Sequence, residues 1–562
     1  MSFFDDASLA FLPSGAAGKD GKAYSIKPTD GTGDFTFSRG SNLAATRVGA
    51  DGLIEKGREN LLIQSNQFDT TWALTNGSSV TSGQSGYDGT NDAWLLTDSG
   101  DVGSYALYEG ISNVGVLTAS IYAKSASTNV VELDLFGSPS PYVQVNLTTG
   151  SITNASNHID AQSVSVGNGW WRISVTSNLS STSYIRVGCD GAGSIYIQDA
   201  QMEIGLAATD VISTGATTGK AGLLEDEPRF DYSGGATCPS LLLEPSRTNL
   251  ITQSEYYGGS AWIKTNVVVT DNDAISPEGV QNAAKVVTSS GSVNVKQDSI
   301  SVTPSTTYTF SFWCKLTSGT TLKGRFYDNT AGADIEYYDY TSQLTIGEWA
   351  RVERTFTTPA GCTSIQVWLL AQSATLVTAH YWGAQAEAGS YPTSYIPNHS
   401  GGSVTRGADD CGDAGDAATF NSTEGVLYAE IAALADDLTF RGVSLSDGTY
   451  NNRCVLRYGG ASNRINVLVS SAGSIVFDNN FILSNIKDFS KIAIKWKAND
   501  FALWVNGSEV ATDTSGASPT GLSQFQFADS INSSVFFYGK TNQVLYFPTA
   551  LSDADLTTLT TL

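Results

Sequence analysis

Apolar and polar residues alternate along most of the chain in short runs. Examples are "VVELDLF" (130–136), "YVQVNL" (142–147), "KGRFYD" (323–328) and "SIQVWLLAQ" (364–372). Alternation with a period of two turns one set of side chains toward a core and the other toward solvent, as in a half-buried β-strand. Turn residues recur roughly every 8 to 12 positions, the spacing of sandwich folds. The pattern predicts an all-β protein of tandem jelly-roll β-sandwiches in series.

The chain contains an internal repeat. "RENLLIQSNQF" (58–68) and "RTNLITQSEYY" (247–257) share an Arg, Asn, Leu, Gln and Ser in the same frame, 189 positions apart. Later phrases recur in the same order, including "DAQMEIG" (199–205) and "GAQAEAG" (383–389). A repeat of this length indicates two homologous domains. We therefore expect one sandwich at 58–215 and a second at 247–400.

Residues 416–562 predict a third sandwich. In "FALWVNGSEVA" the pair Asn506-Gly507 separates two alternating runs, which is a strong hairpin signal. "ALSDADLTTLTTL" predicts a short C-terminal helix with Ser552 as its N-cap. The remaining segments are rich in Gly, Asp, Ser and Pro and predict an N-terminal docking arm and two linkers, at 1–57, 216–246 and 401–415.

Composition narrows the possible partners. The formal charge of −24 over 562 residues, without a cluster of Lys and Arg, argues against nucleic-acid binding. The sequence contains no run of about 18 apolar residues, so we expect no membrane insertion. Asp5 and Asp6 occupy the place of the basic region of a secretory signal. The six cysteines lack a CxxC pair, which gives zinc no support, and their scatter fits small buried thiols better than disulfides.

Four phrases together resemble a family of tailed-bacteriophage virion proteins. They are "FSRGSNLAATRVGADGLIE", "PRFDYSGGATCPSLLLEPSRTNLITQSE", "SYIPNHSGGSVTRGADD" and "VLYFPTALSDADLTTLT". The resemblance covers most of the chain. It implies jelly rolls similar to carbohydrate-binding modules, followed by a C-terminal concanavalin A-like or laminin-G-like sandwich. It also implies a place in the virion, as a tail, fibre or capsid-decoration protein.

One departure from that family pattern suggests an insertion. The phrases "DGLIE" and "PRFDY" lie close together in the family, whereas here residues from about 58 to 220 separate them. The first sandwich therefore has the position of an insertion into the family pattern, or of a duplicate of the second sandwich. We expect residues 30–57 and 216–246 to pack against each other.

Carboxylate pairs are the candidates for catalysis. Glu132 with Asp134, and Asp334 with Glu336, stand two positions apart on predicted strands, a spacing that would fit the acid and base of a glycosidase. The C-terminal sandwich lacks the Glu-x-Asp-x-Glu run of concanavalin A-like glucanases. No Gly-x-Ser-x-Gly elbow accompanies the three histidines. We interpret the pairs as solvent-facing acids and predict no catalytic residues.

Aromatic residues give the better prediction of a ligand site. In "DIEYYDY", strict alternation places Tyr338 and Tyr340 on one face with Asp334 and Glu336. Aromatic faces edged by carboxylates suit a glycan contact. Tryptophans that recur in both repeats, such as Trp72 and Trp262, are more typical of two cores.

The resemblance to carbohydrate-binding modules also implies a structural calcium. Its matching positions in the first repeat are Glu59, Asn60, Asp199 and Glu203. These could supply only part of a shell of six to eight oxygens.

The sequence thus predicts a non-enzymatic structural or attachment protein of a phage virion, assembled in the host cytoplasm. Its expected partners are other virion proteins, further copies of itself and host surface glycans. Two alternatives stay open: a glycan depolymerase of the phage tail, and a purely structural capsid or tail component without a ligand.

Overall fold

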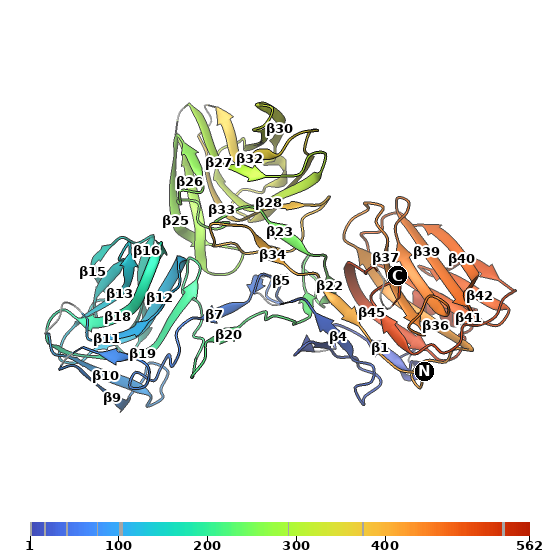
Figure 1. The fold of residues 1–562 in the computed structure, drawn as a ribbon, viewed down its shortest axis with the longest axis horizontal. Coiled ribbons are helices and arrows are strands. Elements are labelled where there is room, and N and C mark those ends of the chain that lie inside the picture. The colour runs from blue at the N-terminus through green and yellow to red at the C-terminus, as the bar shows by residue number, and fades with distance from the viewer. Residues whose placement is uncertain are drawn as a thin grey trace.

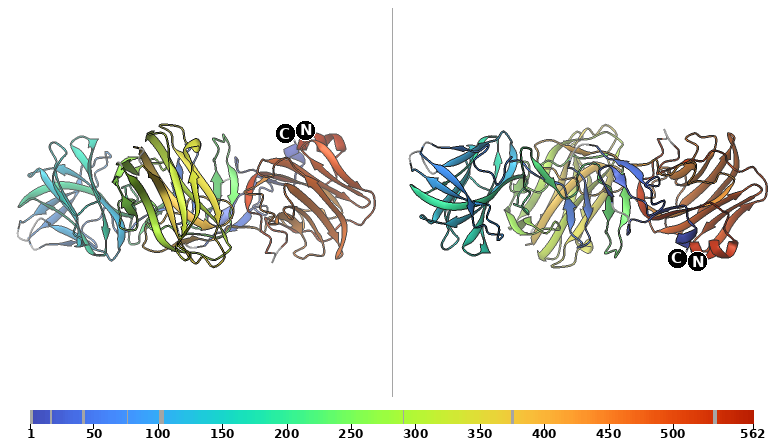
Figure 2. Two further views of the ribbon diagram at one scale, coloured as in Figure 1. Left: turned by 90° about the horizontal axis from the view of Figure 1, so that it is seen from above. Right: turned by 90° about the horizontal axis from the view of Figure 1, so that it is seen from below.

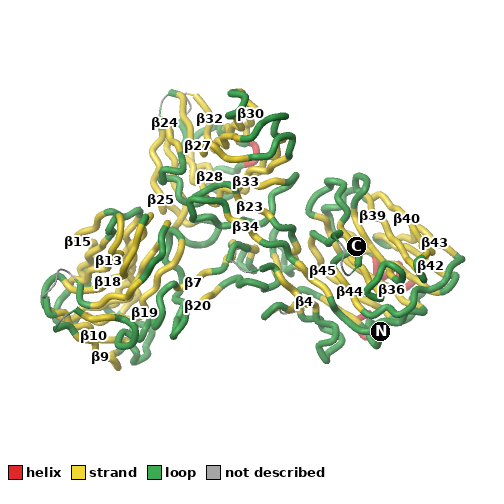
Figure 3. The backbone as a smooth tube through the Cα atoms, viewed as in Figure 1, coloured by secondary structure: helices red, strands yellow, loops and turns green. Residues whose placement is uncertain are grey.

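A computed structural model describes residues 3–15, 18–40, 43–75, 77–100, 105–289, 291–373, 376–530 and 534–562. Strands and loops make up nearly all of it, which confirms the all-β prediction (Figure 3). Three β-sandwiches follow one another along the long axis in chain order, joined by short central strands (Figures 1 and 2). Each sandwich has its own hydrophobic core.

The first sandwich packs two antiparallel sheets face to face. One sheet has the order β16 (Asp160–Gly167), β17 (Trp170–Leu179), β12 (Gly115–Ser125), β19 (Gly193–Ile204), β10 (Ala93–Asp98) and β9 (Ser79–Gln84). The other has the order β15 (Ser151–Ser156), β14 (Tyr142–Asn146), β13 (Val130–Ser138), β18 (Ser181–Cys189), β11 (Leu107–Gly110) and β8 (Ala73–Leu74).

The second sandwich repeats this design with two five-stranded sheets. One has the order β25 (Val267–Ile275), β26 (Gln281–Thr288), β33 (Thr378–Ala388), β28 (Thr307–Ser318) and β31 (Ala350–Thr357). The other has the order β24 (Ile263–Thr265), β27 (Ser292–Ser301), β32 (Ser364–Ser373), β29 (Lys323–Asp328) and β30 (Ala333–Asp339), followed by the 3-10 turn η1 (Thr341–Gln343). The sheet containing β13 and β18 corresponds to the sheet containing β29 and β32.

The repeated "R-x-N-L" phrase forms the same buried hydrogen-bond cluster in both sandwiches, here called the asparagine latch. Asn60 and Asn249 are both fully buried. Each side chain donates to two backbone carbonyls and accepts from two backbone N–H groups. The partners of Asn60, at 2.9–3.2 Å, are Ala200, Ile212, Leu62 and Met202. The partners of Asn249, at 2.9–3.2 Å, are Ala384, Ile396, Ile251 and Ala386.

The third sandwich also has two sheets. The larger has the order β21 (Arg229–Asp231), β22 (Ser240–Leu243), β45 (Gly539–Phe547), β36 (Glu424–Ala433), β41 (Ser490–Lys497), β42 (Asp500–Val505) and β43 (Ser508–Asp513), with β1 (Leu9–Phe11) also paired to β45. The smaller has the order β40 (Ser474–Ile482), β39 (Arg464–Ser471), β38 (Arg453–Tyr458), β37 (Arg441–Ser446) and β44 (Gln524–Gln526).

Parts of the N-terminal segment and of the first linker belong to the third sandwich, which corrects the description of these segments as a separate arm and a linker. Strand β1 and strand β22 both pair with β45, and Phe11, Phe35 and Phe37 lie in the core of the third sandwich. Both chain ends accordingly lie on this sandwich (Figures 1 and 2). The physical reason is that β45 and the aromatic core beneath it need covering, and the sequence after 416 does not supply the cover.

Several short ladders complete the centre of the molecule. They are β2 (Gly18–Lys19), β3 (Lys22–Ala23), β4 (Phe35–Ser38) and β35 (Asp410–Gly412); β5 (Thr46–Val48) with β6 (Ile54–Lys56); β7 (Arg58–Asn60) with β20 (Gly219–Ala221); and β23 (Arg247–Asn249) with β34 (Val404–Arg406).

Residues 39–40 and 43–60 lie beside residues 219–231. Besides the β7–β20 ladder, the Arg39 backbone N–H donates to Asp226 Oδ1 at 2.7 Å, and that of Val48 donates to Asp231 Oδ1 at 2.9 Å. The two ends of the segment that carries the first sandwich therefore meet in space.

Local predictions at the C-terminus are confirmed. Asn506 and Gly507 have φ of 48° and 85° and connect β42 to β43, as a two-residue hairpin turn requires. Helix α2 (Asp553–Thr560) begins after Ser552, whose hydroxyl accepts from the Asp555 N–H. A second helix, α1, spans Phe3–Asp6.

The structure shows the state of the cysteines and the character of the helices. All six cysteines are free thiols, five of them buried and Cys238 exposed. Over the described ranges, the helices are too short and too polar for any of them to cross a membrane.

Candidate functional site

The predicted aromatic platform does not form, because strand β30 contains a bulge. Phe326 pairs with Glu336, but the next residue, Tyr327, pairs with Asp334, so Ile335 is the extra residue. The bulge shifts the alternation by one position. Asp334 therefore shares a face with Tyr337 and not with Tyr338.

Tyr338 and Tyr340 lie in the core instead of on an open face. Their exposed fractions are 5% and 0%, and the Tyr340 hydroxyl donates to the Leu369 carbonyl at 2.8 Å. Tyr337, by contrast, is 54% exposed. Alternation alone therefore misplaced the side chains of Tyr337 and Tyr338.

The open face of the same sheet carries a different cluster, here called the repeat-2 face. Its centre is a row of four residues that pair directly across neighbouring strands, and such pairs project on the same side of a sheet. The row consists of Lys296, Trp368, Arg325 and Tyr337. Tyr327 and Asp334 complete the face, since they pair with each other on the same two strands as Arg325 and Tyr337.

Cations and rings alternate along the repeat-2 face. The guanidinium carbon of Arg325 lies 4.5 Å from the ring centroid of Tyr327, 4.7 Å from that of Trp368 and 5.0 Å from that of Tyr337. Lys296 Nζ lies 4.7 Å from the Trp368 ring. Asp334 forms an ion pair with Arg325. These contacts fix the rings before any ligand arrives.

Hydrogen bonds orient the central tryptophan. Its indole Nε1–H donates to Gln366 Oε1 at 2.9 Å, and Lys296 Nζ donates to the same oxygen at 2.8 Å. The repeat-2 face therefore presents flat rings of fixed orientation, bordered by groups that can donate or accept hydrogen bonds. Sugar rings, which expose C–H groups on one side and hydroxyls at the rim, match such a surface.

Sequence reasoning missed Trp368, Tyr327, Arg325, Tyr337 and Lys296 as site residues. A usable signal was present in two neighbouring strands. In "KGRFYD" and "SIQVWLLAQ" the inward positions include Phe326 and Val367, both fully buried. The neighbours of each along its own strand, Arg325 and Tyr327 or Trp368, therefore face outward. The bulge at Ile335 left no such signal.

Arginines hold three of the four carboxylates considered for catalysis, whereas Glu132 accepts from Gln144 at 2.7 Å. Glu132 and Asp134 are buried, which corrects their interpretation as solvent-facing acids. Asp334 binds Arg325, whereas Glu336 projects from the other side of β30 and binds Arg354. In the first sandwich, Asp134 accepts from Arg186 Nε at 2.7 Å and also from Nη2. Burial raises the pKa of Asp134 despite that guanidinium.

The four predicted calcium ligands do not fit calcium, because most of their oxygens already accept hydrogen bonds. Asn60 Oδ1 belongs to the asparagine latch. Glu203 accepts from the backbone N–H of Thr209 at 2.9 Å, and Asp199 accepts from the Tyr87 hydroxyl at 2.9 Å. Glu59 accepts from the Thr218 hydroxyl at 2.7 Å. Within the described ranges, no group of three or more His, Cys, Asp or Glu is arranged to hold a metal.

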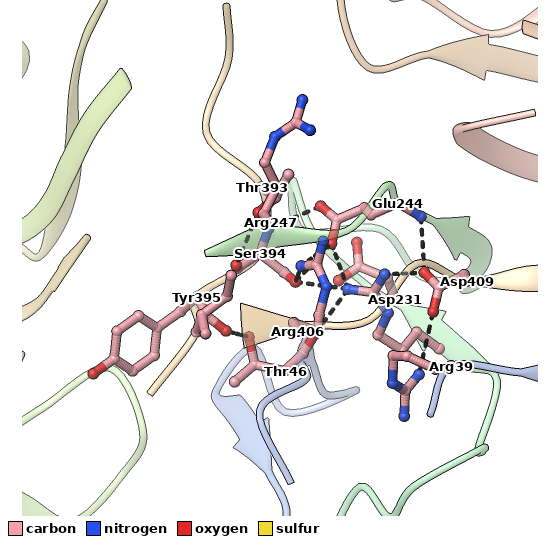
Figure 4. A network of polar contacts seen from close by, with 12 residues as sticks. Arg39, Thr46, Asp231, Glu244, Arg247, Thr393, Ser394, Tyr395, Arg406 and Asp409 are labelled. Carbon is pink, nitrogen blue, oxygen red and sulfur yellow. Dashed lines mark hydrogen bonds and ion pairs between the residues drawn. The ribbon is translucent and has the colours of Figure 1, made fainter. Parts of the chain in front are cut away.

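A buried ionic cluster lies where the central strands meet, and it is here called the central clasp (Figure 4). Glu244 Oε2 lies 2.5 Å from Arg229 Nη1 and 2.7 Å from Arg406 Nη1. Asp409 pairs with Arg229 and, at 3.4 Å, with Arg39. Although burial opposes it, the two arginines hold the pKa of Glu244 well below its usual range. Three arginines share two carboxylates there, and their contacts join segments that lie far apart in the sequence.

A second buried network joins the first two sandwiches beside a cavity of about 300 Å³. Lys56 Nζ lies 3.0 Å from both Glu255 Oε1 and Glu278 Oε2. His399 lines the cavity, and burial lowers its pKa to about 4. The imidazole is therefore neutral at physiological pH. This network, like the clasp, fixes the position of one sandwich against the next.

Comparisons with known proteins point to the second sandwich. Residues 255–375 match the family model of a carbohydrate binding domain, and this range contains the whole repeat-2 face. The match supports a carbohydrate-binding role for this sandwich. No curated protein matches the chain.

The solved structures similar to this chain include carbohydrate-binding modules. The CBM40 of the Ruminococcus gnavus IT-sialidase is 15% identical, over 25% of this chain and 84% of that chain, with a TM-score of 0.23. The CBM22-1–CBM22-2 tandem domain of Paenibacillus barcinonensis Xyn10C is 12% identical, over 63% of this chain and 100% of that chain, with a TM-score of 0.21.

Proposed function

We propose that the protein is a non-enzymatic attachment protein that binds glycans through the repeat-2 face. The observation that carries this proposal is the row of Lys296, Trp368, Arg325 and Tyr337 on an open sheet face within the range that matches the carbohydrate binding domain. Stacking on the rings would supply most of the affinity, and the flanking polar groups would select the hydroxyl pattern.

The absence of catalysis is part of the proposal. A glycosidase needs two carboxylates that flank one glycosidic bond. Asp334 and Glu336 project to opposite sides of β30, and each is bound by a different arginine. Asp134 is bound at both oxygens by Arg186. This geometry favours binding over hydrolysis.

A place in a phage virion is the finer part of the proposal, and the four ordered sequence phrases support it. In this role the protein decorates the particle or belongs to its tail or fibre. Other virion proteins and further copies of the chain are its partners, and glycans of the host surface are its targets. The charge of −24 suits display in many copies, because like-charged surfaces resist non-specific association.

The experiment is a glycan-array measurement on the full-length chain and on two variants. Trp368→Ala removes the central ring and should weaken binding at least about tenfold, since a stacked aromatic anchor contributes more than about 1.4 kcal/mol. The matched control is Tyr450→Ala, because Tyr450 is 53% exposed but lies in the third sandwich. Equal binding by wild type and Trp368→Ala would contradict the proposal.

A reducing-sugar assay on bacterial surface polysaccharides tests the non-enzymatic part. We expect no release of reducing ends by the wild-type chain. Turnover that disappears in Asp334→Ala would establish the depolymerase alternative.

A further inference from the structure

The first sandwich carries its own ring-and-arginine cluster on the sheet that corresponds to the repeat-2 face. The equivalent row of directly paired residues is Tyr108, Arg186, Asp134 and Tyr142. Both rows end in a tyrosine, Tyr142 on β14 or Tyr337 on β30, and the arginine of each row forms an ion pair with an aspartate of the same face. The cluster around Arg186 is here called the repeat-1 face.

Four rings surround the arginine of the repeat-1 face. The Arg186 guanidinium carbon lies 4.3 Å from the Tyr105 ring centroid and 4.4 Å from that of Phe136. Tyr184 pairs directly with Phe136, and their rings stack at 6.2 Å with an interplanar angle of 29°. Tyr108 meets Tyr184 edge-on at 5.2 Å.

Two of these rings are open to solvent. Phe136 is 44% exposed and Tyr184 is 39% exposed. Two adjacent open rings on paired strands, held by a buried ion pair, make a flat apolar surface with a polar rim. A single exposed ring needs no explanation, but a fixed pair does.

The charges of the repeat-1 face differ from those of the repeat-2 face. Asp134 neutralises Arg186 through two hydrogen bonds, and a second carboxylate, Glu132, lies two positions away on the same strand and accepts from Gln144 at 2.7 Å. The repeat-2 face instead places two cations, Lys296 and Arg325, over one tryptophan. An acidic sugar would meet net negative charge on the repeat-1 face.

We infer that the repeat-1 face is a second carbohydrate-binding face, selective for neutral sugars that stack on Phe136 and Tyr184. Arg186 and Asp134 are positioning residues that hold the rings. The inference shares its ligand class with the proposed function but uses a different site. The chain then binds surfaces at two points on one frame, and its avidity exceeds the affinity of either face alone.

The test is affinity electrophoresis of the full-length chain through gels that contain a polysaccharide. The neutral probes are arabinoxylan, mixed-linkage β-glucan and galactomannan, and the acidic probes are alginate and polygalacturonate. Three variants are compared with wild type: Phe136→Ala/Tyr184→Ala, Trp368→Ala/Tyr337→Ala, and the control Tyr450→Ala. The altered side chains are partly exposed, and near-UV circular dichroism checks that each variant folds.

We expect at least one neutral probe to retard the Trp368→Ala/Tyr337→Ala chain, and Phe136→Ala/Tyr184→Ala to weaken retardation by that probe about tenfold. The inference is overturned if Phe136→Ala/Tyr184→Ala retains all binding, or if no neutral probe retards the chain that lacks the repeat-2 rings. Failure of the proposed function gives a different result, namely that Trp368→Ala/Tyr337→Ala binds every probe, the acidic ones included, as strongly as wild type.

Discussion

The two repeats share their buried polar skeleton and differ on their open faces. Asn60 and Asn249 make the same four hydrogen bonds, within the same range of distances. On the open sheet, however, Arg186 and Asp134 occupy the row positions that Trp368 and Arg325 occupy in the second repeat. Folding constrains the buried positions strongly, because an unpaired polar group there is costly, whereas the open row is free to change.

The largest expected effect comes from the asparagine latch, where the repeats should respond alike. Asn60→Ala and Asn249→Ala each leave two buried backbone carbonyls and two buried backbone N–H groups without their hydrogen-bond partner. Each should destabilise its own sandwich by about 4 kcal/mol. Differential scanning calorimetry measures the transitions, and hydrogen exchange assigns each loss to a sandwich. Asn178→Ala, at an exposed position of β17, is the control and should have little effect. Very unequal losses would show that the latches are not equivalent.

Loss of the arginine–aspartate ion pair should cost more stability in the first repeat than in the second. The Asp134 side chain is 6% exposed and the Asp334 side chain is 43% exposed. Asp134→Asn leaves the Arg186 cation without its counter-charge in a mostly buried site and should cost about 3 kcal/mol. Asp334→Asn should cost less than about 1 kcal/mol, because solvent screens an exposed pair. Chemical denaturation of each variant measures both values.

Both partners of the buried pair, Asp134 and Arg186, have raised pKa values. Burial raises the pKa of Asp134, whereas Asp134 raises the pKa of Arg186 although burial opposes it. The carboxylate is the more buried partner and loses more hydration, so its shift reflects burial. The loss of stability on removing one partner depends mainly on the two hydrogen bonds from Arg186 to Asp134. A loss below about 1 kcal/mol in Asp134→Asn would contradict this view.

The smallest expected effect is a pH dependence at one repeat-equivalent position, where the first repeat has a glutamate and the second a glutamine. Glu109 accepts from the Ile63 N–H, and its counterpart, Gln297, accepts from the Thr252 N–H at the repeat-equivalent position. Burial raises the pKa of Glu109 to about 7, and its Oε2 atom is buried without a hydrogen-bond partner. The folded chain therefore holds a proton that the unfolded chain releases.

The sign follows from proton uptake. Between the ordinary pKa of a glutamate and about 7, the native state binds more protons than the unfolded state, so stability falls as pH rises. Glu109→Gln should stabilise the first sandwich by about 2 kcal/mol at pH 8 and leave it unchanged at pH 4. Gln297→Glu is the converse variant and should give the second sandwich the same dependence. Melting curves across this pH range are the measurement, and parallel curves for wild type and Glu109→Gln would contradict the assignment.

The sequence predicted local structure well where a short-range rule applied. The Asn506-Gly507 turn and the Ser552 cap each depend on a few neighbouring residues, and both are present. The repeated phrases indicated homologous sandwiches because buried positions keep their residue types. The predicted orientation of the tyrosines in β30 failed at one residue, Ile335, since a bulge depends on the partner strand. Tyr337 therefore took the place that strict alternation gave to Tyr338.

By itself, the sequence determined the strands, the all-β class and the repeat, because a period of two and turn residues act over a few positions. Only the tertiary structure decided which aromatic residues face outward, which segments complete the third sandwich, and that Glu244 and Asp409 close a clasp around Arg229. Those outcomes depend on contacts between residues tens to hundreds of positions apart. Burial and pairing fix them, and neither can be read from alternation along one strand.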